Sequence, residues 1–173
     1  MCKLTERVKV GGRVDNKGKN HPTIGAMSGF YLFLSSADCK GVFADNRFDN
    51  FRVQFEPEIK LACECRQEWS FALTEISIIT PAKSHSLPPE TCTVLCDLAE
   101  GSYMRETYNP ILRRIDTDAE ASGSLFQTYY VGLNSTQFNC LRIYLKNKDL
   151  DALDAKLWHP STVVNLTLHF QKI

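Results

Sequence analysis

The sequence predicts an all-β protein, a single jelly-roll-like antiparallel β-sandwich of about eight strands. Short runs of alternating apolar and polar residues recur along residues 30–173, and clusters of Gly, Pro, Asn and Asp separate them. The pattern shows no alternation of strands with helices and no internal repeat. A chain of 173 residues is long enough to bury the core of one such domain.

The clearest strand pattern lies near the carboxy terminus, in residues 161–171. Four apolar residues there alternate with mostly polar ones: Val164, Leu166, Leu168 and Phe170. This period of two is typical of a strand with one buried face. We expect the strand to close a sheet. We interpret His169, on its polar face, as a surface residue that could lie at a subunit contact.

Seven further segments are expected to supply its partners: residues 30–35, 48–55, 69–80, 91–98, 110–115, 125–131 and 138–145. Pro57 is expected to end the second of them, because proline cannot donate to a ladder. The apolar residues of 69–80 change face between Leu73 and Ile76, which predicts a bulge or bend near Thr74–Glu75.

The predicted connections are rich in turn-forming residues. Residues 116–124 form a polar loop between two of the predicted strands. Residues 147–160 form an exposed connection that could hold a short helical turn at 150–157.

Residues 1–29 differ in composition from the predicted domain, residues 30–173. Six basic residues outweigh Glu6 and Asp15 there: Lys3, Arg7, Lys9, Arg13, Lys17 and Lys19. Glycines are frequent and large apolar residues are few, so burial within the segment cannot offset the entropy of ordering it. We expect an extended arm that depends on contacts with its own domain or with neighbouring subunits.

Charge and hydropathy narrow the class of protein. The formal net charge is zero, which argues against a dedicated nucleic-acid binder and leaves no net repulsion between copies in an assembly. We expect contact with nucleic acid, if any, only through the arm. No run of 18 to 20 apolar residues predicts a membrane helix, and the charged amino terminus does not resemble a signal peptide. We therefore expect synthesis in the cytosol, with the seven cysteines mostly reduced.

The residues that could support catalysis are scattered. The four histidines lie in different predicted elements and form no local signature with a cysteine: His21, His85, His159 and His169. No glycine-rich phosphate loop is present. We expect a protein that is not an enzyme and needs no cofactor.

Two close cysteine pairs allow two interpretations. The pairs are Cys63 with Cys65 and Cys92 with Cys96. Reduced cysteines in strands commonly serve as small core residues. A zinc site that uses all four is the alternative, although only the second spacing approaches that of structural zinc ligands.

Opposite charges lie close together between residues 105 and 120. Arg105, Arg113 and Arg114 stand beside Asp116, Asp118 and Glu120. Such charges can set the orientation of a subunit contact, and they can equally form an ordinary solvated surface. Together with Lys3, Arg7, Lys9 and Arg13, the three arginines are our candidate assembly contacts.

Three groups of short motifs resemble one protein family. The first group is Ser28–Ser36, Phe43–Phe48, Phe51–Phe55 and Trp69–Ile76; the second is Val94–Leu98 and Pro110–Ile115; the third is Leu141–Leu145 and Leu166–Phe170. Their order resembles the virion structural proteins of Polinton/Maverick elements and the related adintoviruses. The resemblance spans about residues 28 to 171. Family members begin near the position of Met27, so residues 1–26 resemble an added extension.

The resemblance implies a penton-like vertex or minor capsid protein of an adenovirus-like double-stranded DNA virus or endogenous element. Such a protein would form a jelly roll, assemble as a ring of five with neighbouring capsid proteins, and lie in the virion after synthesis in the host cytosol and assembly in the cytoplasm or nucleus. It implies no catalytic, cofactor or metal residues. The alternative is a stand-alone β-sandwich that binds a ligand or host protein through loops such as 81–89 and 147–160.

Overall fold

The computed structural model of the chain describes residues 29–38, 40–62, 68–81, 91–104, 106–116, 122–124, 127–154 and 158–173. The regular structure in this part of the chain consists of β-strands, as the sequence predicts. None of the described residues belongs to a helix that could cross a membrane. The strands form two antiparallel sheets and one small hairpin.

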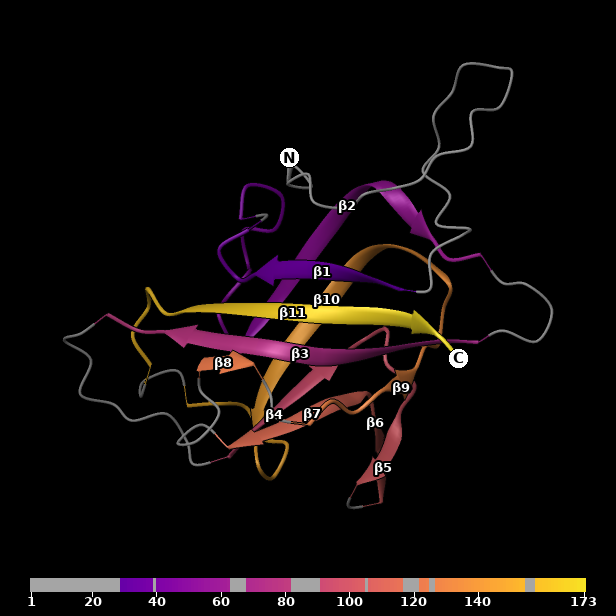
Figure 1. The fold of residues 1–173 in the computed structure, drawn as a ribbon. Coiled ribbons are helices and arrows are strands. Elements are labelled where there is room, and N and C mark those ends of the chain that lie inside the picture. The colour runs from indigo at the N-terminus through magenta and orange to yellow at the C-terminus, as the bar shows by residue number, and fades with distance from the viewer. Residues whose placement is uncertain are drawn as a thin grey trace.

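The first sheet has β11 at its centre, between β1 and β3 (Figure 1). Beyond β3 lie two short strands, β8 and β9, that pair with different parts of it. The bounds are β1 Gly29–Ser35, β3 Trp69–Ile79, β8 Ser122–Ser124, β9 Val131–Gly132 and β11 Val163–Lys172. Residue 33 lies opposite residue 167, and residue 167 lies opposite residue 75, so these three positions form one row across the sheet.

The second sheet has the order β2-β10-β4-β7. Its strands are β2 Asn50–Lys60, β4 Thr91–Cys96, β7 Ile111–Asp116 and β10 Gln137–Asn147. The first four strands alternate between the two sheets, with β1 and β3 in the first and β2 and β4 in the second. This crossing pattern is that of a jelly roll and confirms the predicted fold class.

The core lies between the sheets and is rich in aromatic residues. Phe170 of the closing strand lies at its centre, with ring centroids 4.8 Å from Phe30, 5.1 Å from Phe71 and 6.0 Å from Phe138. The four alternating apolar residues of β11 are all buried, as their period predicts. Packing of this kind stabilises the sandwich through burial of large apolar area.

The predicted bulge in the third strand is confirmed. The pairing of β3 with β11 shifts register here, so that Leu73 lies opposite Leu168 and Glu75 lies opposite Thr167. Thr74 is the extra residue, and its hydroxyl donates to the carbonyl oxygen of Thr167 over 3.1 Å. The bulge lets apolar residues on both sides of it reach the same core.

The prediction that Pro57 ends the second strand is wrong, because β2 continues through it to Lys60. The register between β2 and β10 shifts in this region: Gln54 pairs with Cys140, and the next pair is Ile59 with Phe138. Pro57 therefore lies where the ladder is interrupted, a place that tolerates a residue without an N–H.

The predicted strand at residues 125–131 is also wrong. Of its described residues, 127–131, only Val131 is in a strand. The carbonyl oxygen of Gln127 accepts a hydrogen bond from Arg113, and the Tyr129 ring lies under the same guanidinium at 5.1 Å. Contacts with Arg113, rather than the hydrogen bonds of a strand ladder, thus hold this segment in place.

Two connections also differ from expectation. Residues 150–154 show no helical turn; Ala152 instead forms a bridge with Lys146. The sequence pattern also missed the hairpin of β5 Ser102–Met104 and β6 Thr107–Asn109. Each of these strands is only three residues long, too short for a period of two to be visible.

Candidate assembly surface

The edge strand β1 is apolar on both of its faces. Its inward residues Phe30, Leu32 and Leu34 are buried, as alternation requires. Its outward residues are also aromatic: Tyr31 is 49% exposed and Phe33 is 70% exposed. Aromatic side chains are enriched at protein interfaces, so their exposure here marks a candidate contact surface.

His169 of β11 lies against Tyr31 of this aromatic pair. It is opposite Tyr31 in the ladder, and the two rings stack with centroids 4.4 Å apart. The Tyr130 hydroxyl and the His169 Nδ1 are 2.6 Å apart, within hydrogen-bond distance. Partial burial lowers the pKa of His169, which favours the neutral imidazole. We call Tyr31, Phe33, Tyr130 and His169 the aromatic face.

Gly29 sits at the end of β1 under the histidine. A Cβ at this position would lie 2.5 Å from the carbonyl oxygen of Phe170 and 2.9 Å from Nε2 of His169. Both distances are shorter than a real Cβ tolerates, and one of the two contacts is with rigid backbone. Glycine is therefore required for β1 to approach the imidazole.

One row of facing residues leads from the aromatic face to polar side chains. It runs from Phe33 across Thr167 to Glu75 on three adjacent strands. The Thr167 hydroxyl donates to the Glu75 carboxylate over 2.9 Å. A carboxylate therefore lies in the same row as the most exposed aromatic ring of the sheet.

A second exposed aromatic pair lies on the β5–β6 hairpin, which projects from the sandwich (Figure 1). Tyr103 is 82% exposed and Tyr108 is 60% exposed, and their rings meet edge to face with centroids 5.4 Å apart. The backbone N–H of Gly101 donates to the Tyr108 hydroxyl over 2.9 Å, which anchors the ring at the base of the hairpin. We call this element the tyrosine hairpin.

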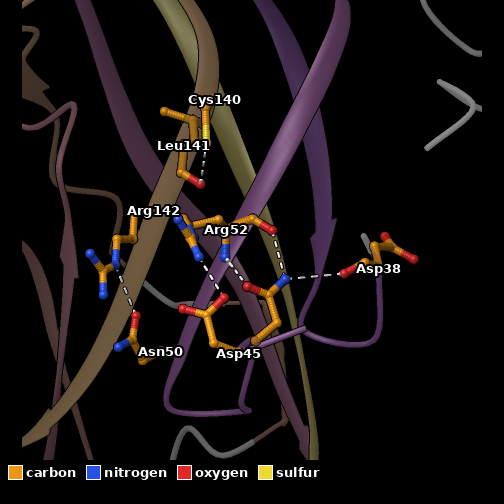
Figure 2. A network of polar contacts seen from close by, with 8 residues as sticks. Asp38, Asp45, Asn50, Arg52, Cys140, Leu141 and Arg142 are labelled. Carbon is orange, nitrogen blue, oxygen red and sulfur yellow. Dashed lines mark hydrogen bonds and ion pairs between the residues drawn. The ribbon is translucent and has the colours of Figure 1, made fainter. Parts of the chain in front are cut away.

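Arginines face outward from the second sheet. Arg52 of β2 and Arg142 of β10 lie directly opposite each other in the ladder, an arrangement that is unfavourable for like charges. Figure 2 shows how neighbours compensate: Asp45 pairs with Arg52 over 2.5 Å, and Nε of Arg142 donates to Asn50 over 3.0 Å. The hydrogen bond from Arg52 is the main reason that the pKa of Asp45 lies below its usual value.

The structure places the predicted charged contacts in different surroundings. Arg113 is buried, where it contacts Gln127 and Tyr129 of its own subunit. Arg114 is exposed, and its guanidinium donates to the carbonyl oxygen of Lys148 over 3.1 Å. Five candidates lie outside the described residues: Lys3, Arg7, Lys9, Arg13 and Arg105. Their role in assembly stays a prediction.

The core interpretation of the second cysteine pair is confirmed. Cys92 and Cys96 are buried among the apolar residues between the sheets. Burial raises the pKa of Cys92 to about 12 and raises the pKa of Cys96 as well, so both stay as thiols. Cys63 and Cys65 lie outside the described residues. In the part of the chain that the structure describes, no three metal-ligating side chains come together.

Sequence reasoning placed His169 at a possible subunit contact but missed the other residues of the aromatic face and the tyrosine hairpin. A signal for the first was present, because residues 30–34 read Phe-Tyr-Leu-Phe-Leu and contain no polar residue at any outward position. Such a run is typical of a strand covered on both faces. That β1 is an edge strand with an uncovered face became evident only from the sheet order.

In the part of the chain that the structure describes, fold and surfaces together define an antiparallel jelly-roll protein that exposes the aromatic face and the tyrosine hairpin. Comparison with family models and with curated proteins finds no match. Among solved structures, the chain is similar to a mavirus penton protein, whose selenomethionine-labelled form was crystallised. The two share 8% identity with a TM-score of 0.48, over 85% of this chain and 100% of that one.

Proposed function

We propose that the chain is a non-enzymatic virion structural protein, a penton-like vertex or minor capsid component that assembles as a ring of five. It would serve an adenovirus-like double-stranded DNA virus or a related endogenous element. Neighbouring capsid proteins would be its partners, and the virion its location.

The jelly roll and the position of the resembling motifs support this proposal. The jelly roll is a recurrent architecture of viral capsid proteins, shared with lectins and cupins. Three of the stretches that resemble Polinton/Maverick virion proteins are residues 28–36, 69–76 and 166–170. Their described residues include β1 and parts of β3 and β11, which are three adjacent strands of one sheet. The motifs therefore describe one continuous structural unit.

The observation that supports assembly most directly is the presence of two separate aromatic surfaces on one chain. A closed ring needs a heterologous interface, in which one patch of a subunit meets a different patch of the next. The aromatic face lies on the first sheet, and the tyrosine hairpin projects elsewhere from the sandwich (Figure 1). Each exposes aromatic area that a partner would remove from water.

Native mass spectrometry of the purified full-length chain tests the ring. We expect a species of five copies, and we expect the protein in purified virus particles by peptide mass spectrometry. A chain that stays monomeric at high concentration and is absent from particles would contradict the proposal.

A binding role is the second candidate, and the tyrosine hairpin favours it. Tyr103 and Tyr108 form a small protruding aromatic pair that could enter a pocket of another protein. The double variant Tyr103→Ser/Tyr108→Ser separates the two functions. Loss of the five-copy ring supports the structural role, whereas an intact ring that no longer enters particles supports a docking role for the hairpin.

A further inference from the structure

The outer edge of β1 lacks the features that usually protect an edge strand. On one side β1 pairs with β11, and no strand among the described residues pairs with its other side. Its seven residues, Gly-Phe-Tyr-Leu-Phe-Leu-Ser, include no charge and no proline. Natural sheets block such edges with Lys, Pro, bulges or a covering segment. An edge without such protection, beside the exposed rings of Tyr31 and Phe33, is open to pairing with another strand.

The arm contains one segment with the pattern of a strand. Residues 4–10 read Leu-Thr-Glu-Arg-Val-Lys-Val. Thr5, Arg7 and Lys9 would share one face, whereas Leu4, Val8 and Val10 would share the other with Glu6. Such a strand could place its valines beside the core and its cations beside the aromatic face.

Charge favours the same pairing. Residues 1–28 contain six basic and two acidic residues, so residues 29–173 contain 14 basic and 18 acidic of the 20 of each kind. The arm is therefore positive and the rest of the chain negative, although the whole is neutral. Aromatic rings also attract cations directly, and Tyr31 and Phe33 offer two exposed rings at this edge.

We propose that residues 4–10 of one chain add as a strand to the free edge of β1 in a neighbouring chain, with Arg7 and Lys9 beside Tyr31 and Phe33. Strand addition of this kind takes its affinity from main-chain hydrogen bonds and its specificity from alternate side chains. The inference deepens the proposed function, because it names the contact that joins successive subunits of the ring.

The length of the connection favours a neighbour over the arm's own domain. Residues 11–28 separate the segment from β1, whereas hairpin loops usually have about two to five residues. A connection of that length spans up to about 60 Å. A domain of this size has a radius of gyration of about 15 Å. The arm can therefore reach an adjacent subunit with length to spare.

Proline in the segment tests the strand addition in the full-length chain. Val8→Pro removes a backbone donor and breaks the strand, so native mass spectrometry is expected to show loss of the ring. Val14→Pro makes the same change in the arm outside the segment and should leave the ring intact. A ring that survives Val8→Pro overturns the strand addition and leaves the proposed capsid role standing. Equal loss with Val14→Pro overturns the assignment to residues 4–10.

Mixing two variants tests whether the contact joins different chains. Tyr31→Lys/Phe33→Lys places charges on the acceptor edge that repel Arg7 and Lys9, and both positions are exposed enough to spare the fold. Each variant alone is expected to be monomeric. A mixture with Val8→Pro should give one-to-one dimers, because one chain keeps a working arm and the other a working edge. A mixture that stays monomeric overturns the exchange between chains.

Discussion

Two phenylalanines show how burial separates core residues from contact residues. Phe170 is fully buried among three other rings, whereas Phe33 is 70% exposed. We expect Phe170→Ala to lower the free energy of unfolding by about 3–5 kcal/mol, and Phe33→Ala to change it by no more than about 0.5 kcal/mol. Urea unfolding of the dilute monomer measures both. Phe33→Ala should nevertheless weaken self-association, and comparable destabilisation by the two variants would contradict their assigned roles.

His169 is expected to make the fold sensitive to mild acid. Burial holds its pKa below the ordinary 6.5, so the unfolded chain binds a proton more readily than the folded chain. The neutral imidazole contributes its full stability above pH 6.5. This contribution is lost as the pH falls from 6.5 through the lowered pKa of His169. Thermal unfolding of wild type and His169→Gln across this window measures the effect. The variant should lose less stability on acidification, and equal losses would refute the prediction.

At the scale of single strands, two threonines in β3 and β4 predict opposite effects of one substitution. The Thr74 hydroxyl donates to the Thr167 carbonyl at the bulge, so Thr74→Val should lower the free energy of unfolding by about 1 kcal/mol. The Thr93 hydroxyl is buried with no hydrogen-bond partner among the described residues, so Thr93→Val should raise it by about 1 kcal/mol. Denaturant titration of both variants and of wild type measures the two changes in the free energy of unfolding. Changes of the same sign would contradict this account.

Strand pattern explains which elements the sequence could predict. β11 is long and its apolar residues alternate, and β10 alternates from Leu141 to Leu145, so the positions of both follow from the period of two. Short strands such as β8 and β9 give no such signal, and long-range pairing with β3 alone places them in the sheet. The prediction that Pro57 ends β2 is wrong for a related reason. The effect of Pro57 depends on a register shift between β2 and β10, a strand about 80 residues away in the sequence.

At the scale of the whole molecule, the separation of charge predicts assembly that depends on salt. The arm is basic and the remaining chain is acidic, so opposite charges would attract between neighbouring subunits of the proposed ring. Raising the salt from about 0.05 M to about 1 M shortens the screening length to about 3 Å. We expect sedimentation velocity to show a smaller fraction of ring at high salt. A fraction of ring that stays constant or rises would show that apolar contacts alone hold the subunits together.

The candidate site was harder to predict than the fold. Sequence reasoning selected charged residues as assembly contacts, yet Arg113 is buried against Tyr129 of its own chain, and the arm residues lie outside the described part. The exposed aromatic pairs were missed, because an apolar residue in a strand pattern is normally assigned to the core. Whether a strand face is covered depends on sheet order and on which strands are edges, and neither is local in the sequence.

The sequence by itself determined the all-β fold class, the closing strand, the bulge at Thr74 and the contrast between a basic arm and an acidic domain. These features follow from side-chain period, charge and turn residues, all of which are local. Only the tertiary structure decided that β1 is an edge, that Tyr31 stacks on His169, and that Arg52 faces Arg142 across a ladder. Each of these depends on pairing between segments far apart in the chain, where many registers satisfy the same local pattern and packing selects one.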